Sequence, residues 1–266
     1  MHPFNYYDPK TVDEAVEILK KFGDKAKCLA GGTDVLVQTR GERYELDAIV
    51  DVKKIPELTS VEWTQDHLVI GAATPCYVLY EDQKVSEAFP GIIDSASLIG
   101  GIQIQSRASL GGNLCNASPS ADGICSLIVH DAECVIAGPN GVREIPVEDM
   151  CVGPGKNALG EGEFLVSIKI PLKNSTFSAS YERFIPRNEM DIAVAAVGPT
   201  PIFAEEASQM LIGKEPTEEN IKNASNKAKE IASPISDMRG TVEHRKDLIE
   251  VLTRRTLSKA VERVGV

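Results

Sequence analysis

Two pairs of adjacent glycines place the strongest constraint on how this chain folds. The first lies in the stretch 29–36 (LAGGTDVL) and the second in the stretch 109–113 (SLGGN). Because glycine has no Cβ, it lets the backbone approach a ligand or another strand closely, and successive amides in such a turn form a concavity suited to phosphate. One Gly-Gly pair alone is more often a tight turn or a bulge. Two turns of the same character indicate a chain that grips two ends of one diphosphate-containing cofactor.

Size and charge narrow the class of protein. The chain has 266 residues, 42% of them apolar and 25% charged, which is enough for a sizeable core and for two domains. A net charge of −11 argues against nucleic acid or an anionic membrane as a partner, because phosphate contacts need clustered Lys and Arg. The first residues, MHPFNYYDPK, show no signal peptide, and no apolar run is long enough to span a bilayer. We therefore expect a cytoplasmic protein.

The six cysteines raise the question of disulfides or a metal site. A chain without a secretion signal is expected to keep its thiols reduced. Four cysteines fall between residues 115 and 151, but the gaps of nine, eight and sixteen residues between them match no ligand spacing for zinc or an iron–sulfur cluster. Cys134 stands in an apolar run and is predicted to be core. We predict no metal ligand, with a cluster as the minor alternative.

Capping signals and hydrophobic periodicity predict the secondary structure. Thr11 and Glu14 form a capping box, Thr217 caps a later helix, and Asn140-Gly141 is a hairpin turn. Helices are predicted over 12–22, 74–84, 89–100, 124–130, 218–232 and 242–264. Strands are predicted over 26–30, 48–52, 63–73, 134–137, 142–145, 163–170 and 178–185, and the stretch 109–113 is predicted to be a loop. The boundary near 173–178 divides the chain into domains of residues 1–173 and 178–266.

With their flanking sequence, the two glycine turns resemble those of the FAD-binding (medium) subunit of the molybdenum hydroxylases, of the xanthine dehydrogenase and carbon monoxide dehydrogenase type. The resemblance covers residues 1 to about 195 and resumes from 198 to about 263. It implies an α+β fold, with a two-subdomain FAD-binding domain of the p-cresol methylhydroxylase type followed by a smaller α+β C-terminal domain. Relatives carry further strand-forming sequence at the join 193–201, so the C-terminal sheet is expected to be shortened by about a hairpin.

The resemblance also implies which residues bind FAD. The stretch 29–36 would wrap the diphosphate, and 109–113 would contact the cofactor near its flavin end. Arg183 stands where relatives commonly carry Lys, which keeps the charge but changes the geometry. The implied FAD-binding residues are Leu29, Ala30, Gly31, Gly32, Thr33, Asp34, Val35, Leu36, Ser109, Leu110, Gly111, Gly112, Asn113, Ser118, Asp122, Leu165 and Arg183. No residue of the chain is assigned a catalytic role, because the flavin carries the redox chemistry.

Several positions depart from the family pattern. Gln105 and Ser106 replace the usual Arg-Asn pair, and Ala108 replaces a glycine. No Gly-x-Gly-x-x-Gly follows a strand, which argues against a Rossmann site. The stretch 153–156 (GPGK) resembles the end of a P-loop, but Asn157 replaces the required Ser or Thr.

The resemblance implies a complex of three subunits: a molybdopterin large subunit, a small subunit with two [2Fe-2S] clusters, and this chain. Electrons would pass singly from the clusters to a non-covalently bound FAD and then to an acceptor such as NAD+. The sequence of residues 113–122 (NLCNASPSAD) favours a xanthine-dehydrogenase-like complex. A stand-alone flavin oxidase and a non-catalytic scaffold that has lost FAD are the alternatives. A partner subunit would decide the substrate.

Overall fold

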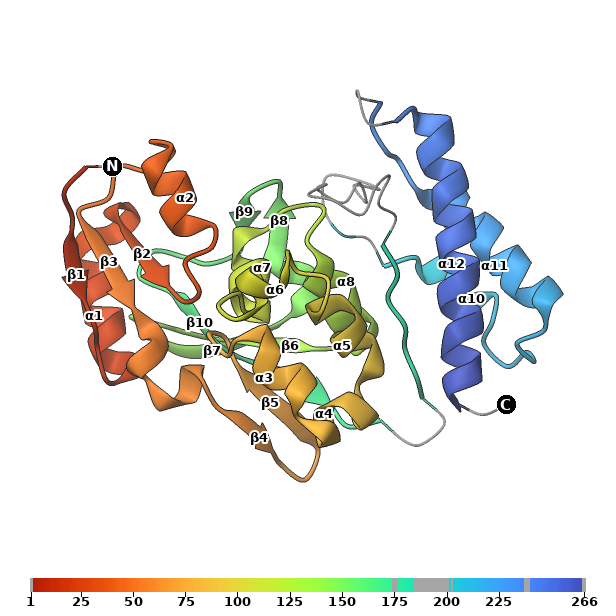
Figure 1. Ribbon diagram of the computed structural model, residues 1–266, viewed down its shortest axis with the longest axis horizontal. Coiled ribbons are helices and arrows are strands. Elements are labelled where there is room, and N and C mark those ends of the chain that lie inside the picture. Colours follow the sequence, from red (N-terminus) through yellow and green to blue (C-terminus); the bar gives the residue numbers. More distant parts are fainter. Residues whose placement is uncertain (1, 174–176, 184–200, 202, 237–239, 265–266) are drawn as a thin grey trace.

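The computed structural model describes residues 2–173, 177–183, 201, 203–236 and 240–264. Three parts follow one another along the molecule: a small parallel sheet with its helices, a larger antiparallel sheet covered by short helices, and a C-terminal group of helices (Figure 1). This arrangement confirms the predicted α+β class.

The N-terminal part is built around a parallel three-stranded sheet. Its strands lie in the order β1 (Asn5–Tyr7), β3 (Ala48–Asp51) and β2 (Ala26–Leu29). Its helices are α1 (Val12–Phe22) and α2 (Val35–Arg40). The hydroxyl of Thr11 accepts a hydrogen bond from the Glu14 amide at 3.2 Å, as the capping box predicts. The Glu14 carboxylate accepts from the Lys10 amide, one residue before the expected partner.

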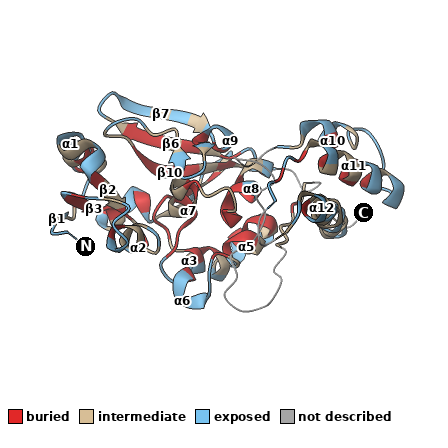
Figure 2. Ribbon diagram, turned by 90° about the horizontal axis from the view of Figure 1, so that it is seen from above, coloured by how far each residue is buried: buried red, intermediate tan, exposed pale blue. Residues whose placement is uncertain are grey.

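The central part contains a five-stranded antiparallel sheet. Its strands lie in the order β4 (Val61–Trp63), β5 (His67–Gly71), β10 (Phe164–Pro171), β6 (Glu133–Gly138) and β7 (Gly141–Pro146). Although β10 comes last in the sequence, it occupies the middle of the sheet and is buried along most of its length. Figure 2 shows β6 and β10 largely buried, whereas β7 lies exposed at the edge.

Short helices and one small hairpin complete the central part. The helices are α3 (Cys76–Glu81), α4 (Gln83–Ala88), α5 (Pro90–Ala96), α6 (Ile102–Gln105), α7 (Leu110–Asn116), α8 (Asp122–Val129) and α9 (Val147–Met150). The hairpin consists of β8 (Cys151–Gly153) and β9 (Lys156–Asn157). The largest core cluster joins side chains of α3, α5, α7 and α8 to the inner strands β5, β6 and β10. Cys134 is fully buried in this cluster, as predicted.

The C-terminal part consists of α10 (Glu205–Gln209), α11 (Glu218–Ile231) and α12 (Val242–Val264). Helices α11 and α12 pack side by side (Figure 1). Before them, residues 177–183 run along α5 and α8. Arg263, near the end of α12, donates hydrogen bonds of 2.7 and 2.9 Å to the Asp94 carboxylate on α5 and one of 2.7 Å to the Ala179 carbonyl. The last helix is thereby tied to the central part.

Four secondary-structure predictions outside the glycine turns were wrong in detail. The predicted strand 63–73 is a hairpin of β4 and β5, because Thr64 turns the chain by bonding its hydroxyl to the His67 amide. The predicted helix 74–84 breaks at Asp82, whose carboxylate caps α4 by accepting from the Val85 amide. The predicted helix 89–100 ends at Ala96 as α5. Residues 178–183 form no strand, because the Tyr181 amide bonds to Asp94 on α5 and the side chains of Tyr181 and Arg183 bond to Asp122 on α8.

Other predictions fall on residues that the structure does not describe. The end of the predicted strand 178–185 and the expected loss of a hairpin at 193–201 lie almost wholly in the stretch 184–200. The domain boundary at 173–178 stays a prediction. Among the described residues, no helix is both long and apolar enough to cross a bilayer.

Candidate functional site

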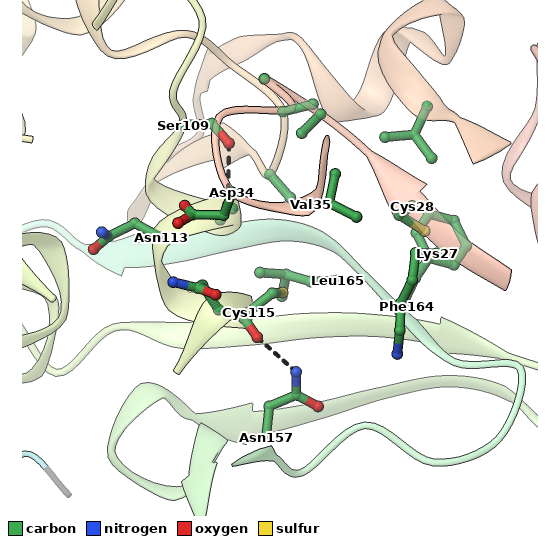
Figure 3. Close-up of a pocket in the computed structure, with 18 of the residues that line it drawn as sticks. Lys27, Cys28, Asp34, Val35, Ser109, Asn113, Cys115, Asn157, Phe164 and Leu165 are labelled. Carbon is green, nitrogen blue, oxygen red and sulfur yellow. Dashed lines mark hydrogen bonds between the residues drawn. The ribbon is translucent and has the colours of Figure 1, made fainter. Parts of the chain in front are cut away.

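A cavity of about 560 Å³ is bordered by the edge strand β2 of the small sheet and by α7, β10 and the β8–β9 hairpin of the central part. This volume lies in the range of small-molecule and cofactor sites. Most of the residues predicted to bind a cofactor line it (Figure 3). From the two glycine turns these are Ala30, Gly31, Gly32, Thr33, Asp34, Val35, Ser109, Gly111, Gly112 and Asn113, and Leu165 joins them from β10.

The two glycine turns touch each other. The carbonyl of Gly31 accepts a hydrogen bond of 3.0 Å from Nε of Arg107, which lies just before the second turn. A Cβ on Gly31 would stand 2.1 Å from the carbonyl oxygen of Arg107 and 3.0 Å from the amide nitrogen of Ala108. Glycine at position 31 therefore permits contact between two backbone segments, and both turns face one crevice.

The first turn offers free hydrogen-bond donors to this crevice. Gly32 has φ of +76°, a conformation that favours glycine. Within the described residues, the backbone amides of Gly32, Thr33 and Asp34 donate to no acceptor. Free, adjacent amides of this kind suit the oxygens of a phosphate group. The first turn therefore fits the diphosphate of a dinucleotide.

The second turn is not the predicted loop but the start of helix α7. The Ser109 hydroxyl accepts a hydrogen bond of 3.0 Å from the Gly112 amide and so caps the helix. A Cβ on Gly111 would stand 2.4 Å from the carbonyl oxygen of Ala72. Asn113 accepts from the Gly123 amide at 3.0 Å, which fastens α7 to α8. The Gly112 amide is therefore already bonded within the helix cap and is not a free donor to the cavity.

Six predicted binding residues do not line the cavity. Leu29 and Leu36 pack beneath Gly32, where their side chains would lie 2.9 and 3.0 Å from an added Cβ. Leu110 is buried in the core, and the Ser118 hydroxyl bonds to that of Ser120 at 3.2 Å. The remaining two are Asp122 and Arg183. A role of these residues in cofactor binding stays a prediction.

Asp122 and Arg183 form a buried ion pair next to the Asn113–Gly123 contact. Nη1 of Arg183 lies 3.1 Å from the Asp122 carboxylate and also donates to the Leu98 carbonyl at 2.7 Å. The Tyr181 hydroxyl donates to the other carboxylate oxygen at 2.9 Å. Burial raises the pKa of Asp122, and the nearby Arg183 charge and the Tyr181 hydrogen bond only partly oppose this effect. Burial and the Asp122 charge also raise the pKa of the Tyr181 phenol.

Several cavity residues were missed by sequence reasoning. The Gln38 side chain of α2 donates to the Asn116 side chain of α7 at 3.0 Å and so links the two walls. Asn157 of β9 donates to the Cys115 carbonyl at 2.7 Å. The remaining missed residues with charged or aromatic side chains are Lys27, Tyr44, Lys156, Glu163 and Phe164. Only their positions in the sequence could have indicated that two of these residues line the cavity. Lys27 precedes the first turn, and Lys156 belongs to the GPGK stretch, which forms the hairpin turn between β8 and β9.

The thiols at the cavity are not activated for chemistry. Cys28 and Cys115 both line it. Burial raises the pKa of the Cys28 thiol to about 12 and also raises that of Cys115, so neither thiol has the lowered pKa of a reactive cysteine. All six cysteines are free, and no group of three His, Cys, Asp or Glu side chains in the described ranges is placed to hold a metal ion.

The chain matches known families over both of its predicted parts. Residues 2–173 match the family described as the FAD binding domain in molybdopterin dehydrogenase, and residues 177–260 match the CO dehydrogenase flavoprotein C-terminal domain. The chain is 30% identical to the xanthine dehydrogenase FAD-binding subunit of Escherichia coli O157:H7, over 98% of this chain and 97% of the relative. It is 28% identical to the carbon monoxide dehydrogenase medium chain of Hydrogenophaga pseudoflava, over 97% and 96% of the two chains.

Solved structures agree with these matches. A carbon monoxide dehydrogenase structure from Hydrogenophaga pseudoflava, described as lacking the Mo-pyranopterin moiety of the molybdenum cofactor, superposes with a TM-score of 0.92 and 29% identity, covering 99% of both chains. A Cu,Mo-CO dehydrogenase structure gives the same TM-score at 28% identity, over 99% of this chain and 100% of that one. The chain therefore belongs to the FAD-binding (medium) subunit family of the molybdenum hydroxylases, and is an oxidoreductase subunit whose cofactor is FAD.

Proposed function

We propose that this chain is the electron-transfer subunit of a cytoplasmic, heterotrimeric, xanthine-dehydrogenase-like complex. It would receive electrons from the [2Fe-2S] clusters of a small subunit, pass them to NAD+, and leave substrate hydroxylation to a molybdopterin large subunit. The relative named as a xanthine dehydrogenase subunit supports this choice through its 30% identity over nearly the whole chain. The cavity shared by the two glycine turns, with its free amides, carries the proposal.

The described residues give FAD a defined orientation in this proposal. The amides of Gly32, Thr33 and Asp34 would hold the diphosphate, and Leu165 and Ile99 would form an apolar wall for the ring at the α7 end. Asp122 immediately precedes Gly123, whose amide donates to Asn113, so the Asp122–Arg183 pair would set the charge near the ring. When bound, FAD supplies a carrier that stores two electrons and exchanges them with the iron–sulfur partner and the final acceptor.

The proposal assigns separate tasks to the two predicted domains. Residues 1–173 would hold the cofactor, and residues 178–266 would position the chain in the complex. Leu29, Leu36, Leu110 and Ser118 would support the binding turns from behind. Arg263, through Asp94, would keep the C-terminal helices against the cofactor domain.

The first experiment measures flavin binding by the purified full chain. After reconstitution with FAD and removal of free cofactor, the protein is expected to keep the flavin absorption bands. A protein that stays colourless would support the scaffold alternative and contradict the proposal. Anaerobic addition of NADH to the flavin-loaded chain is expected to bleach these bands, because electron exchange with NAD+ runs in both directions. Flavin bands that stay unchanged after addition of NADH would contradict NAD+ as the electron acceptor.

The second experiment tests assembly. A tagged copy of the chain, expressed from its own genome, is expected to co-purify with an iron–sulfur protein and a molybdenum protein, and the isolated complex is expected to oxidise xanthine or hypoxanthine with formation of NADH. Isolation of the chain alone, with rapid reoxidation of its flavin by O₂, would instead indicate a stand-alone oxidase.

A further inference from the structure

Lys27 and Arg43 both lie over the Tyr44 ring beside the cavity, and a third basic residue, Lys156, lines the cavity from the β8–β9 hairpin. Lys27 lies on β2, Arg43 lies in the connection from α2 to β3, and Lys156 begins β9. Nζ of Lys27 lies 5.3 Å from the centroid of the Tyr44 ring, and Cζ of Arg43 lies 5.7 Å from the same centroid. Lys27, Tyr44 and Lys156 line the cavity. We call Lys27, Arg43 and Lys156 the cationic rim.

The β8–β9 hairpin, which carries Lys156, packs against Arg43. A Cβ on Gly155, the residue before Lys156, would stand 2.8 Å from Nη2 of Arg43, so the guanidinium lies directly against the hairpin turn. The Gly155 amide donates to the Ala117 carbonyl at 2.8 Å, which fixes the turn against the end of α7. The rim therefore joins three segments that are distant in the sequence.

The rim cations have no carboxylate partners. Within the described residues, none of the three forms an ion pair, whereas Lys53, Lys169 and Lys229 each do. Unpaired cations gathered at one place are unexpected in a chain of net charge −11. A cluster of one sign beside a cavity attracts a ligand of the opposite sign.

The carboxylates around the cavity do not neutralise the rim. The Glu163 carboxylate accepts hydrogen bonds of 2.8 and 2.7 Å from Arg143 and is therefore already paired. The other carboxylate that lines the cavity belongs to Asp34 in the first turn, and burial raises its pKa. Figure 3 shows Lys27 on one side of the cavity, with Ser109 and Asn113 on the opposite side. Lys27 thus lies across the cavity from the first turn of α7.

We propose that the cationic rim binds the adenylate half of FAD, so that Lys27, Arg43 and Lys156 are specificity residues that favour FAD over FMN. This inference rests on the proposed placement of FAD in the cavity. The first turn would hold the diphosphate, and the rim would neutralise the part of its charge next to the adenosine. FMN carries the flavin and one phosphate but lacks the adenylate group that the rim would hold.

The test compares FAD and FMN binding to the full chain after its flavin has been removed. Lys27→Gln, Arg43→Gln and Lys156→Gln are each expected to weaken FAD binding by about two- to fivefold, the effect of a solvent-accessible ion pair. The triple variant is expected to lose at least about tenfold, while FMN affinity stays unchanged. Rising salt should weaken FAD binding to the wild type more than to the triple variant, because salt screens exposed charges.

A matched control separates local from overall charge. Lys222 is exposed on α11 and forms no ion pair among the described residues, so Lys222→Gln removes the same charge far from the rim and should leave FAD affinity unchanged. If the triple variant kept wild-type affinity for FAD, or lost affinity equally for FAD and FMN, the proposed role of the cationic rim would be contradicted. Failure of the wild type to bind FAD at all would instead contradict the placement of the cofactor.

Discussion

Nε of Arg107 donates a hydrogen bond of 3.0 Å to the carbonyl of Gly31, across 76 residues of sequence. This contact fastens the first glycine turn to the segment that leads into the second. If the turns faced apart, a cofactor could not reach both. Because they touch, the cavity has one continuous wall made from both turns.

Gly31→Ala tests this contact. The new Cβ would stand 2.1 Å from the backbone oxygen of Arg107, so one turn must move. We expect a loss of at least about 2 kcal/mol in the free energy of unfolding, measured with denaturant, together with weaker FAD binding. Gly101→Ala is the control, since its Cβ would meet only the flexible Gln103 side chain at 3.4 Å. Equal stability of the two variants would contradict the tight contact.

Substitution by alanine should have different effects on stability at the two neighbouring glycines of the second turn. In Gly111→Ala the Cβ would lie 2.4 Å from the backbone oxygen of Ala72, and in Gly112→Ala it would lie 3.1 Å from the movable Ser109 hydroxyl. We expect Gly111→Ala to cost at least about 2 kcal/mol and Gly112→Ala to stay within about 1 kcal/mol of the wild type, because alanine favours a helix. Denaturant unfolding of the flavin-free protein measures both. The reverse order would show that residues 110–112 are not helical in solution.

The Asp94–Arg263 pair should couple the last helix to the central part. Burial of Asp94 opposes its charge, but hydrogen bonds from Arg263 and from the Tyr181 amide outweigh this effect and hold the Asp94 pKa below its usual value. In a double-mutant cycle with Asp94→Asn and Arg263→Gln, we expect a coupling energy of about 1–2 kcal/mol in the free energy of unfolding. Additive effects would mean that the pair contributes nothing of its own to stability.

His130 should make the protein less stable in mild acid. Its ring is buried against Phe89 and Phe177, and neither of its nitrogens has a hydrogen-bond partner in the part of the chain that the structure describes. Burial lowers its pKa from 6.5 to about 4. Between about pH 4 and pH 6.5 the unfolded chain binds a proton at His130, whereas the folded chain does not. Stability attributable to His130 is therefore complete above about pH 6.5 and falls by roughly 1.4 kcal/mol per pH unit towards pH 4.

His130→Leu removes this titration and the two unpartnered nitrogens. We expect the variant to keep wild-type stability at neutral pH and to lose less stability than the wild type between pH 6.5 and 4, measured by denaturant unfolding at several pH values. Identical slopes for the two proteins would show that His130 is accessible to protons in the folded state.

Local sequence signals were sufficient where a residue bonds to near neighbours. Thr11 and Thr217 cap their helices as predicted, and the β6–β7 hairpin turns at residues 139–140, one position before the predicted Asn140-Gly141. Local sequence signals failed where contacts with residues distant in the sequence decided the conformation. Residues 109–113 contain two glycines and looked like a loop, but the Ser109 cap and the packing of Gly111 against Ala72 stabilise a helix. Residues 178–183 alternate like a strand but bond to Asp94, Leu98 and Asp122.

The sequence by itself determined the family, the α+β class and FAD as the cofactor, because the two glycine turns and their flanking residues are local patterns that relatives share. The tertiary structure decided that these turns share one wall, that Gly112 gives its amide to Ser109, and that Lys27 and Arg43 lie at one tyrosine ring with no carboxylate partner among the described residues. The physical reason is that close packing and charge pairing depend on distances through space between segments far apart in the chain, and these distances are fixed only when the sheets and helices pack together.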